Sequence, residues 1–408
     1  MQTYPGEPLN ILHTIGLEQL YPLVRCQLDL DQSLSSTRLK QAVSLAAQVV
    51  PEILGYYDLP HNMFVVPTKV SGDVVQLISP DCQPDELPLD WMHTTQVKIY
   101  LQPHHSGQRF TIFMSHILSD GAGFKAFLYL LAACYNHGEK AIKGWHNEHE
   151  ITPVQALINS RMKANTAKQT TDHPSQPLFL PQLKDHATSG YHVGYLQLSR
   201  AESLHLKTVA HHLDITLNDL FMAAFGQIVQ QYSGINDLSL ACPTDMRQYF
   251  TPPAAKTLRI ANYTARYNLN LPQTRDLPLT DLLQLVHRQM QILKQEKQFL
   301  QSVAPLVKQA GRATLAQLQQ IVEDHYHVRP IAYTNFGILE PSRLKFNGVQ
   351  VKQCVMTGSF RQAPMFQVAV SSFGKQIILA FNLIGSQAEY RFGMMILRQM
   401  KQNMLVLH

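Results

Sequence analysis

The chain has 408 residues, of which 45% are hydrophobic and 15% are charged. This composition supplies a sizeable apolar core and excludes wholesale disorder, and the length predicts about two or three domains. The net charge is +5, from 34 Lys and Arg against 29 Asp and Glu, and the basic residues are spread along the chain. No run of five like charges occurs, which argues against nucleic-acid binding and against a polybasic membrane surface.

The cysteines indicate neither a disulfide framework nor a zinc site. They are odd in number, widely spaced in the sequence and form no Cys-x-x-Cys pair: Cys26, Cys82, Cys134, Cys242 and Cys354. The N-terminal segment contains Glu7 and Glu18 and lacks a basic start followed by an apolar block, so no secretory signal is predicted. The longest apolar stretch, residues 124–135, is too short to cross a bilayer. We therefore expect a cytoplasmic protein without a membrane span.

A polar, proline-containing segment at 145–189 separates two halves of comparable size. Its apolar periodicity is weak, apart from one short helix expected at 154–162. We therefore expect an N-terminal lobe at 1–150, a linker at 151–189 and a C-terminal lobe at 190–408.

The first half mixes strands and helices. An apolar run at 21–30 predicts a strand, and Ser35 or Ser36 then caps a helix that Pro51 closes. Further strands are expected at 75–78, 96–101 and 109–116, and a helix is expected at 123–135. The strand at 109–116 is the clearest, because its residues alternate strictly between two faces, with Phe110, Ile112, Met114 and His116 on one of them.

The second half continues the mixture. Thr216 is a suitable N-cap for a strongly apolar helix that ends at Gly234. Strands are expected at 193–198, 238–242, 331–336, 345–355, 366–371 and 377–383, and other helices at 201–211, 279–300, 304–325 and 387–406. Because the elements show no regular βαβ alternation and no Gly-x-Gly-x-x-Gly occurs, we expect an α/β or α+β fold with mixed sheets rather than a Rossmann domain.

The residues that carry chemistry are His116, Asp120 and Gly121, which form His-x-x-x-Asp-Gly between the clearest strand and the following helix. A histidine among apolar neighbours at the end of a strand is desolvated, which favours the neutral imidazole. A neutral imidazole accepts a proton from a hydroxyl or an amine, so His116 is a candidate general base. Asp120 would hold the turn by pairing with an arginine elsewhere, and Gly121 would permit a tight turn without a Cβ clash.

A purely structural interpretation stays open, with a buried histidine satisfied by the backbone, an N-cap aspartate and a turn glycine. Other constellations are weaker. No Gly-x-Ser-x-Gly occurs, which disfavours a serine hydrolase. The remaining histidine pairs lack partners at metal-ligand spacing or lie in the polar linker, so no metal is expected: His104-His105, His211-His212, His325-x-His327 and His146-x-x-His149.

The motif resembles the signature of the acyltransferases related to chloramphenicol acetyltransferase. These include condensation domains of nonribosomal peptide synthetases, plant BAHD acyltransferases and alcohol O-acetyltransferases. The resemblance covers most of the chain, because "TLNDLFMAAF" at 216–225, "PTDMR" at 243–247 and "TNFG" at 334–337 follow the family's order and spacing. Condensation domains often carry two histidines in tandem, whereas Ser115 stands here at the first position and His116 at the second, which is the base in the family.

The resemblance implies two lobes, each like a chloramphenicol acetyltransferase subunit, with a tunnel between them and His116 at its middle. It implies that Asp120 points away from the base and pairs with an arginine, for which Arg247 is the best match. It also places Asn335 and Gly337 in a turn near the tunnel, with Thr334 as a weak candidate donor to an oxyanion. Structural alternatives stay open for these residues, namely a surface arginine at position 247 and an ordinary strand-end turn at 334–337.

The function that follows is an acyltransferase that moves an acyl group from a thioester to a hydroxyl or amine acceptor, with His116 as general base. No permanently bound cofactor is implied, and the co-substrate would be acyl-CoA or acyl-phosphopantetheine. The departure at Ser115 favours a free-standing O- or N-acyltransferase, and acyl-CoA is the simpler donor. The alternatives are a stand-alone condensation domain served by a separate acyl-carrier protein, and a catalytically silent binding protein. A monomer is expected, because a duplicated chain can supply both sides of the tunnel itself.

Overall fold

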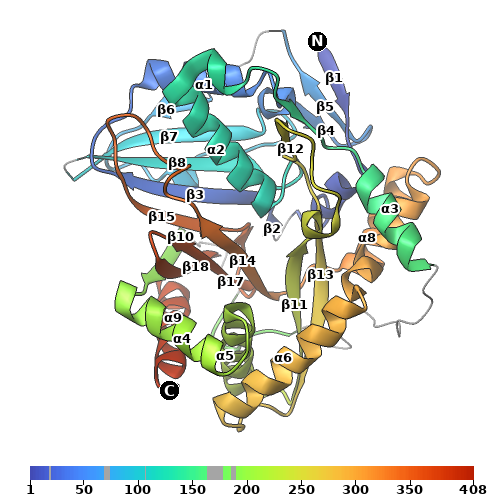
Figure 1. Ribbon diagram of the computed structural model, residues 1–408, viewed down its shortest axis with the longest axis vertical. Helices are drawn as coiled ribbons and strands as arrows, with labels where there is room; N and C mark the ends of the chain where they lie inside the picture. Colours follow the sequence, from blue (N-terminus) through green and yellow to red (C-terminus); the bar gives the residue numbers. More distant parts are fainter. Residues whose placement is uncertain (18–19, 69–73, 106, 163–177, 185–189) are drawn as a thin grey trace.

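The structure, a computed structural model, describes residues 1–17, 20–68, 74–105, 107–162, 178–184 and 190–408. Its two largest sheets have five and four strands and lie one above the other in Figure 1, with helices packed on both. Each of these sheets contains parallel and antiparallel pairs, so the expectation of a mixed α/β fold is confirmed.

The five-stranded sheet has the order β15-β3-β8-β7-β6. β3, β8 and β7 are antiparallel neighbours, whereas β6 runs parallel to β7. Helices α1 and α2 pack on this sheet, and their apolar side chains share one buried cluster with its strands. The bounds are Leu23–Leu30 for β3, Val75–Leu77 for β6, Val97–His104 for β7, Gly107–Ser115 for β8, Val351–Thr357 for β15, Ser36–Ala46 for α1 and Gly121–His137 for α2.

Local sequence explains why these two helices form where they do. The Ser35 side chain accepts a hydrogen bond from the backbone of Arg38 and caps α1, and the Asp120 side chain caps α2 in the same way. α2 ends at Gly138, whose φ of 59° lies in the left-handed region that glycine adopts without strain. Phe124 and Phe127 are fully buried, which anchors the first two turns of α2 on the sheet.

The four-stranded sheet has the order β10-β18-β17-β14. β14 and β17 are parallel, and the other neighbours are antiparallel. Helices α4, α5 and α9 lie in the lower part of Figure 1 and contribute to the larger buried cluster together with this sheet. The bounds are Gly190–Gln197 for β10, Ile331–Leu339 for β14, Phe366–Phe373 for β17, Gln376–Gly385 for β18, Arg200–His212 for α4, Leu217–Ser233 for α5 and Gln387–Leu405 for α9.

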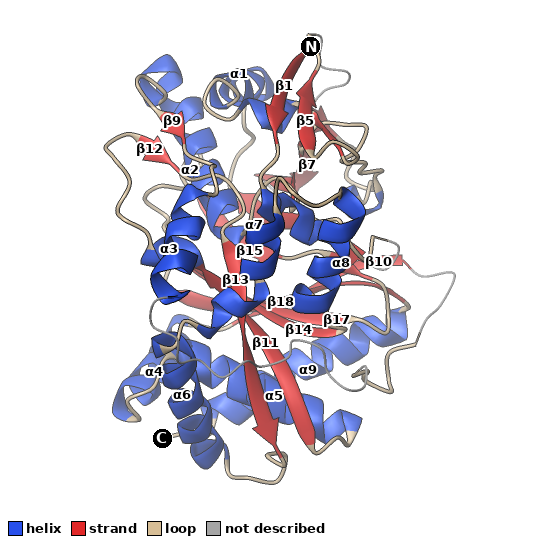
Figure 2. Cartoon of the chain, turned by 90° about the vertical axis from the view of Figure 1, so that its right-hand side faces the viewer, coloured by secondary structure: helices blue, strands red, loops and turns tan. Residues whose placement is uncertain are grey.

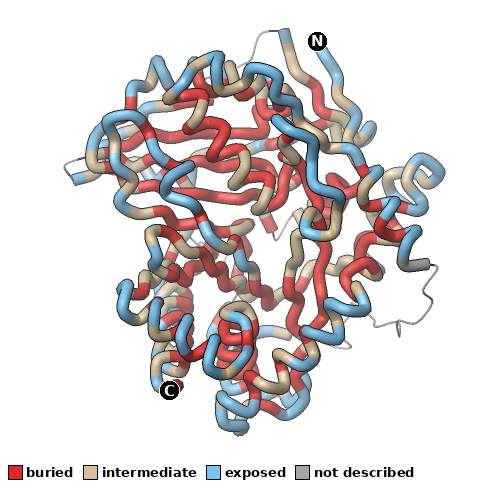
Figure 3. The backbone as a smooth tube through the Cα atoms, viewed as in Figure 1, coloured by how far each residue is buried: buried red, intermediate tan, exposed pale blue. Residues whose placement is uncertain are grey.

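A long antiparallel ribbon of β11 and β13 lies beside β14, the edge strand of the four-stranded sheet, and is prominent in Figure 2. Helix α6 packs against α5 and β13, and α7 and α8 pack against η1, a 3-10 helix near the N-terminus. Buried residues concentrate in the strands, and exposed ones in the outer helices and loops (Figure 3). The bounds are Asp237–Asp245 for β11, Thr264–Pro272 for β13, Leu279–Gln295 for α6, Ala304–Gln309 for α7, Leu315–Tyr326 for α8 and Pro8–His13 for η1.

Strands cross the expected boundary between the two halves of the sequence. β15 comes from the second half and completes the first sheet by pairing with β3. Two short pairs also join the halves, β16 with β2 and β12 with β9. Conversely, η1 comes from the first half, and its Leu9, Ile11 and Leu12 belong to the buried cluster formed mainly by the second half. The bounds of the short strands are Leu20–Tyr21 for β2, His146–Asn147 for β9, Thr257–Leu258 for β12 and Phe360–Arg361 for β16, and a separate small sheet holds Gln2–Pro5 for β1, Tyr56–Asp58 for β4 and Met63–Val66 for β5.

The structure differs from the local predictions at one helix and one strand. The single helix expected at 304–325 is two helices, α7 and α8, because Gly311 adopts a φ of 74° between them. β13 was not predicted, although its alternating apolar residues are a strand pattern. Cys26 and Cys354, widely separated in the sequence, have sulfur atoms only 3.6 Å apart in neighbouring strands. The short helix of the linker is confirmed as α3, Thr152–Met162, whereas 163–177 and 185–189 lie outside the described residues.

Candidate functional site

His116 lies in the turn between β8 and α2. Its backbone N–H donates to the carbonyl of Pro22 at 3.0 Å, and its own carbonyl accepts a hydrogen bond from the Asn262 side chain at 2.8 Å. The Asn262 and Asn10 side chains both donate to the carbonyl of Ile117, at 2.7 and 2.5 Å. Backbone groups on both sides of the histidine are therefore fixed by residues from other parts of the chain.

The His116 imidazole is stacked on the ring of His13, with centroids 3.7 Å apart and an interplanar angle of 21°. Its Nδ1 is buried and makes no hydrogen bond, and the residue lines a cavity. Burial lowers the pKa of His116 below 6.5, and the nearby charge of Asp120 offsets only part of that effect. The imidazole is therefore neutral at pH 7, the form that can accept a proton.

The Asp120 carboxylate accepts structural hydrogen bonds from the start of α2, from Tyr263 and from Arg247. One carboxylate oxygen accepts from the backbone of Gly123 at 2.8 Å, and the other accepts from the backbone of Tyr263 at 2.6 Å and from Arg247 at 2.9 Å. The residue is only 1% exposed. Burial alone would raise the pKa of Asp120, but the Arg247 guanidinium and these hydrogen bonds outweigh it and hold that pKa below its usual value.

Arg247 forms the ion pair that the sequence analysis expected, between residues 127 positions apart. The same guanidinium lies 2.8 Å from Asp245 and donates to the backbone carbonyls of Arg259 and Ala261. It also stacks over the Tyr263 ring, 4.8 Å from its centroid. Although burial alone would lower it, the pKa of Arg247 is raised by the two carboxylates, so the charge is permanent. The arginine thereby ties the start of α2 to the loop after β11.

Gly121 is required for a reason other than the one that the sequence suggested. Its φ is not positive, so the turn itself does not need glycine. A Cβ at this position would lie 2.6 Å from the ring of Phe336, which belongs to β14 in the second sheet. The glycine therefore allows close approach between α2 and β14.

The residues of the "TNFG" segment lie in β14 and line the same cavity as His116. A register shift interrupts the pairing of β14 with β17 after Asn335, and Gly337 follows it with a φ of 68°. Asn335 donates to the side chain of Asn218 at 3.0 Å and accepts from the backbone of Gly337 at 2.8 Å. Thr334 lines the cavity, and its role as an oxyanion donor stays a prediction. Ser115 is fully buried and is not among the lining residues.

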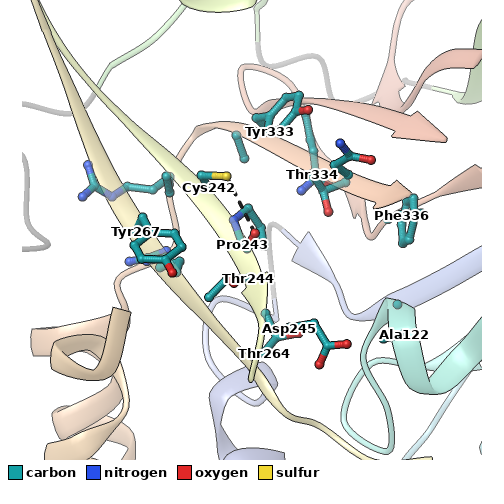
Figure 4. Close-up of a pocket in the computed structure, with 18 of the residues that line it drawn as sticks. Ala122, Cys242, Pro243, Thr244, Asp245, Thr264, Tyr267, Tyr333, Thr334 and Phe336 are labelled. Carbon is teal, nitrogen blue, oxygen red and sulfur yellow. Dashed lines mark hydrogen bonds between the residues drawn. The ribbon is translucent and has the colours of Figure 1, made fainter. Parts of the chain in front are cut away.

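The cavity has a volume of about 630 Å³ and is lined by elements from both halves of the chain. Figure 4 shows side chains of β11, β13 and β14 gathered around it, with Ala122 of α2 on the same side as Phe336 of β14. His116 and Gly121 contribute from the first half, and Thr334, Asn335 and Gly337 from the second.

Several lining residues were not identified from the sequence. His13 lies in η1, Lys125 one turn into α2, and Arg361 in β16. Lys125 donates to the carbonyl of Phe336 at 2.7 Å, which is a second link between α2 and β14. For Arg266 of β13 a signal existed, because recognising the alternation of that strand would have placed it beside the buried Tyr267. His13 and Arg361 lie in short elements without periodicity, so their sequences carry no comparable signal.

Among the described residues, no three His, Cys, Asp or Glu side chains are grouped as a metal site would require. No helix among the described segments is long and apolar enough to cross a membrane.

Comparison of the sequence identified neither a matching family model nor a matching curated protein. Comparison of the structure gave matches over nearly the whole chain. The first condensation domain of the calcium-dependent antibiotic synthetase has a TM-score of 0.65 at 13% identity, covering 100% of this chain and 97% of that one. The condensation domain of the Monacolin K polyketide synthase MokA has a TM-score of 0.64 at 11% identity, with coverage of 100% and 97%. Polyketide synthase associated protein 5 from Mycobacterium tuberculosis has a TM-score of 0.63 at 13% identity, with coverage of 99% and 98%.

These identities are low, so the matches establish the fold and do not by themselves establish an activity. Both sheets, the ribbon of β11 and β13 and the cavity lined by both halves lie within the matched length. The chain therefore has the mixed α/β fold of the condensation domains, the fold that the His-x-x-x-Asp-Gly signature led us to expect.

Proposed function

We propose that the protein is an acyltransferase that moves an acyl group from a thioester donor to a hydroxyl or amine acceptor, with His116 as the general base. The observation that carries the proposal is the state of the His116 imidazole. It lines a cavity formed by both halves of the chain, its pKa is lowered by burial, and its backbone is fixed on both sides. A positioned neutral imidazole is the group that deprotonation of an alcohol or amine requires.

The reaction needs no covalent enzyme intermediate, because a thioester already has a good leaving group. His116 takes the proton of the acceptor O–H or N–H as the new C–O or C–N bond forms at the acyl carbon. The C–S bond then breaks, and His116 returns the proton to the departing thiolate. Thr334 is the candidate donor to the oxyanion that forms in between, since it lines the same cavity.

Asp120 and Arg247 would act on this reaction through geometry. Their ion pair holds the first turn of α2 against the loop after β11, and the turn before α2 carries His116. Gly121 serves the same end by letting β14 approach. We therefore assign all three as positioning residues.

The donor has two candidate forms. Acyl-CoA remains the simpler one, since it needs no second protein. A separate carrier protein bearing acyl-phosphopantetheine is favoured by the structural similarity to condensation domains of two synthases. Both forms present the same thioester, so the site chemistry does not choose between them. A catalytically silent binding protein is the non-enzyme alternative, and the neutral, cavity-lining His116 argues against it.

The test is thiol release measured with acetyl-, octanoyl- and palmitoyl-CoA and with an acylated carrier protein, each with and without alcohol and amine acceptors. His116→Ala should lower the transfer rate about 10²–10⁴-fold. Melting temperature and donor affinity should stay close to wild type, because the side chain borders a cavity and its one ring contact is the stack on His13. His211→Ala is the matched control, since His211 is exposed and does not line the cavity. Undiminished transfer by His116→Ala would remove the basis of the assignment, and unfolding of that variant would support a structural histidine.

A further inference from the structure

The wall of the cavity is unevenly charged. Among the described residues, five cationic side chains line it against one carboxylate, that of Asp245. Asp245 lies 2.8 Å from Arg247, which it shares with Asp120, so its charge is partly compensated. The cations come from both halves of the chain: Lys125, Arg266, Lys294, Arg329 and Arg361. A cavity lined in this way attracts anions.

Arg361 is the most unusual of these residues. It is only 7% exposed and lies in β16, where it pairs with Leu20 of β2. One guanidinium nitrogen donates to the carbonyl of Arg329 at 2.8 Å, whereas Nε is buried and makes no hydrogen bond. No carboxylate of the described chain lies within ion-pair distance of it. Buried charges in proteins are normally paired, so this arginine lacks the anion that its position calls for.

Arg361 stays charged in spite of its surroundings and lines the same cavity as His116. Burial and the neighbouring charge of Arg266 lower the pKa of Arg361 to about 10, so the guanidinium is still protonated at pH 7. Arg361 and His116 line the same cavity, and the charge of Arg361 further lowers the pKa of His116. Gly358 and Ser359, on the same short segment, also line the cavity.

We propose that Arg361 binds an anionic group, a carboxylate or a phosphate, carried by the acyl acceptor beside His116. Guanidinium groups bind such oxyanions through two parallel hydrogen bonds, which suits a buried site. The acceptor is the better source than the donor, because the pantetheine arm separates the thioester at His116 from the phosphates of CoA or of a carrier. The substrate class is therefore an anionic alcohol or amine, such as a hydroxy acid, an amino acid or a phosphorylated alcohol. This inference rests on the proposed function for the identity of the ligand, and on the arginine alone for the anion site.

The first experiment measures anion binding without any turnover. Inorganic phosphate is titrated at constant ionic strength, with chloride as the compensating ion, and the melting temperature is followed. Wild type should be stabilised in a saturable way, and Arg361→Gln should bind phosphate at least about tenfold more weakly. Arg361→Lys should retain part of the binding, because it keeps the charge. Arg312→Gln is the matched control on an exposed arginine outside the cavity, and it should bind like wild type.

Stability in the absence of phosphate separates a ligand-binding arginine from a structural one. Removing a buried, uncompensated charge should leave the melting temperature of Arg361→Gln unchanged or higher than that of wild type. A clear loss of stability in that variant would show that the arginine supports the fold, and the proposal would be wrong. Equal phosphate binding by wild type and Arg361→Gln would overturn it as well.

The second experiment tests the source of the anion with matched acceptors and donors. Glycine and 3-hydroxybutyrate are compared with their amides, using octanoyl-CoA and the phosphate-free octanoyl thioester of N-acetylcysteamine. Arg361→Gln should reduce the preference in kcat/KM for the acid over the amide by about ten- to hundredfold with both donors. A defect seen only with octanoyl-CoA would assign the arginine to the donor phosphates and refute the proposal. If neither wild type nor Arg361→Gln transfers acyl groups while the Arg361-dependent phosphate binding persists, the proposed function fails and the anion site stands.

Discussion

Arg247→Ala tests whether the ion pair under α2 holds the site together. Among the described residues, Arg247 is the only cationic ion-pair partner of the Asp120 carboxylate, and the substitution removes it. The Asp120 side chain is 1% exposed. It also removes donors to the carbonyls of Arg259 and Ala261. Breaking a buried pair from one side leaves an uncompensated charge and typically costs about 3–5 kcal/mol. At about 2.1 cal/mol/K of unfolding entropy per residue, that loss lowers the melting temperature of a 408-residue chain by about 4–6 °C.

The assay is unfolding in guanidinium chloride and by heat, followed by the fluorescence of Trp91 and Trp145. Arg275→Ala is the matched control, because Arg275 forms an exposed pair with Asp276 and should cost less than about 1 kcal/mol. In an Asp120→Asn background, Arg247→Ala should cost clearly less than it does alone, because the two side chains are coupled.

The pH dependence of this stability loss has a definite sign. In wild type, the lowered pKa of Asp120 gives a stabilisation that is present above its unfolded-state pKa and is lost as the pH falls through the folded-state pKa. Without Arg247, burial raises the pKa of Asp120, so the carboxylate is protonated more readily and its unpaired charge disappears. The deficit of Arg247→Ala should therefore be smaller at pH 5 than at pH 7. A variant as stable as Arg275→Ala, or a deficit independent of both pH and Asp120, would refute the reasoning.

Two further predictions follow from the geometry at His116 and Gly121. The logarithm of kcat/KM should fall on acidification as the His116 imidazole is protonated. The midpoint of this fall should lie below pH 6.5, because burial lowers the pKa of His116. A midpoint above 6.5 would contradict the burial argument. Gly121→Ala should destabilise the protein by about 1–3 kcal/mol, because its Cβ meets the Phe336 ring at 2.6 Å. Phe336→Leu should restore part of that loss in thermal unfolding, and absence of any rescue would mean that the ring is not the obstacle.

Local patterns in the sequence determined most of the secondary structure. The alternation at 109–116 predicted β8, and the cap at Thr216 with the glycine at 234 predicted α5 and its limits. The His-x-x-x-Asp-Gly spacing indicated where β8 gives way to α2, and Asp120 is indeed the N-cap of that helix. These features are encoded within a few residues, because periodicity and capping are local interactions.

The tertiary structure decided which residues meet at the site. Arg247 reaches Asp120 across 127 residues, and its match rested on family resemblance because no local rule could pair them. His13 stacks on His116, and Arg361 lines the same cavity, although neither stood out in the sequence. Gly121 was expected for its backbone freedom, whereas the Phe336 ring is what excludes a Cβ there.

The physical reason is that the cavity is built by long-range strand pairing. β15 joins β3 and β16 joins β2, so the end of the chain is brought against its beginning. Which distant strands pair depends on the packing of whole sheets, and the periodicity of a single segment does not encode it. The sequence by itself therefore determined the elements and the candidate base, and only the folded chain determined the charge and the walls of the cavity that surrounds it.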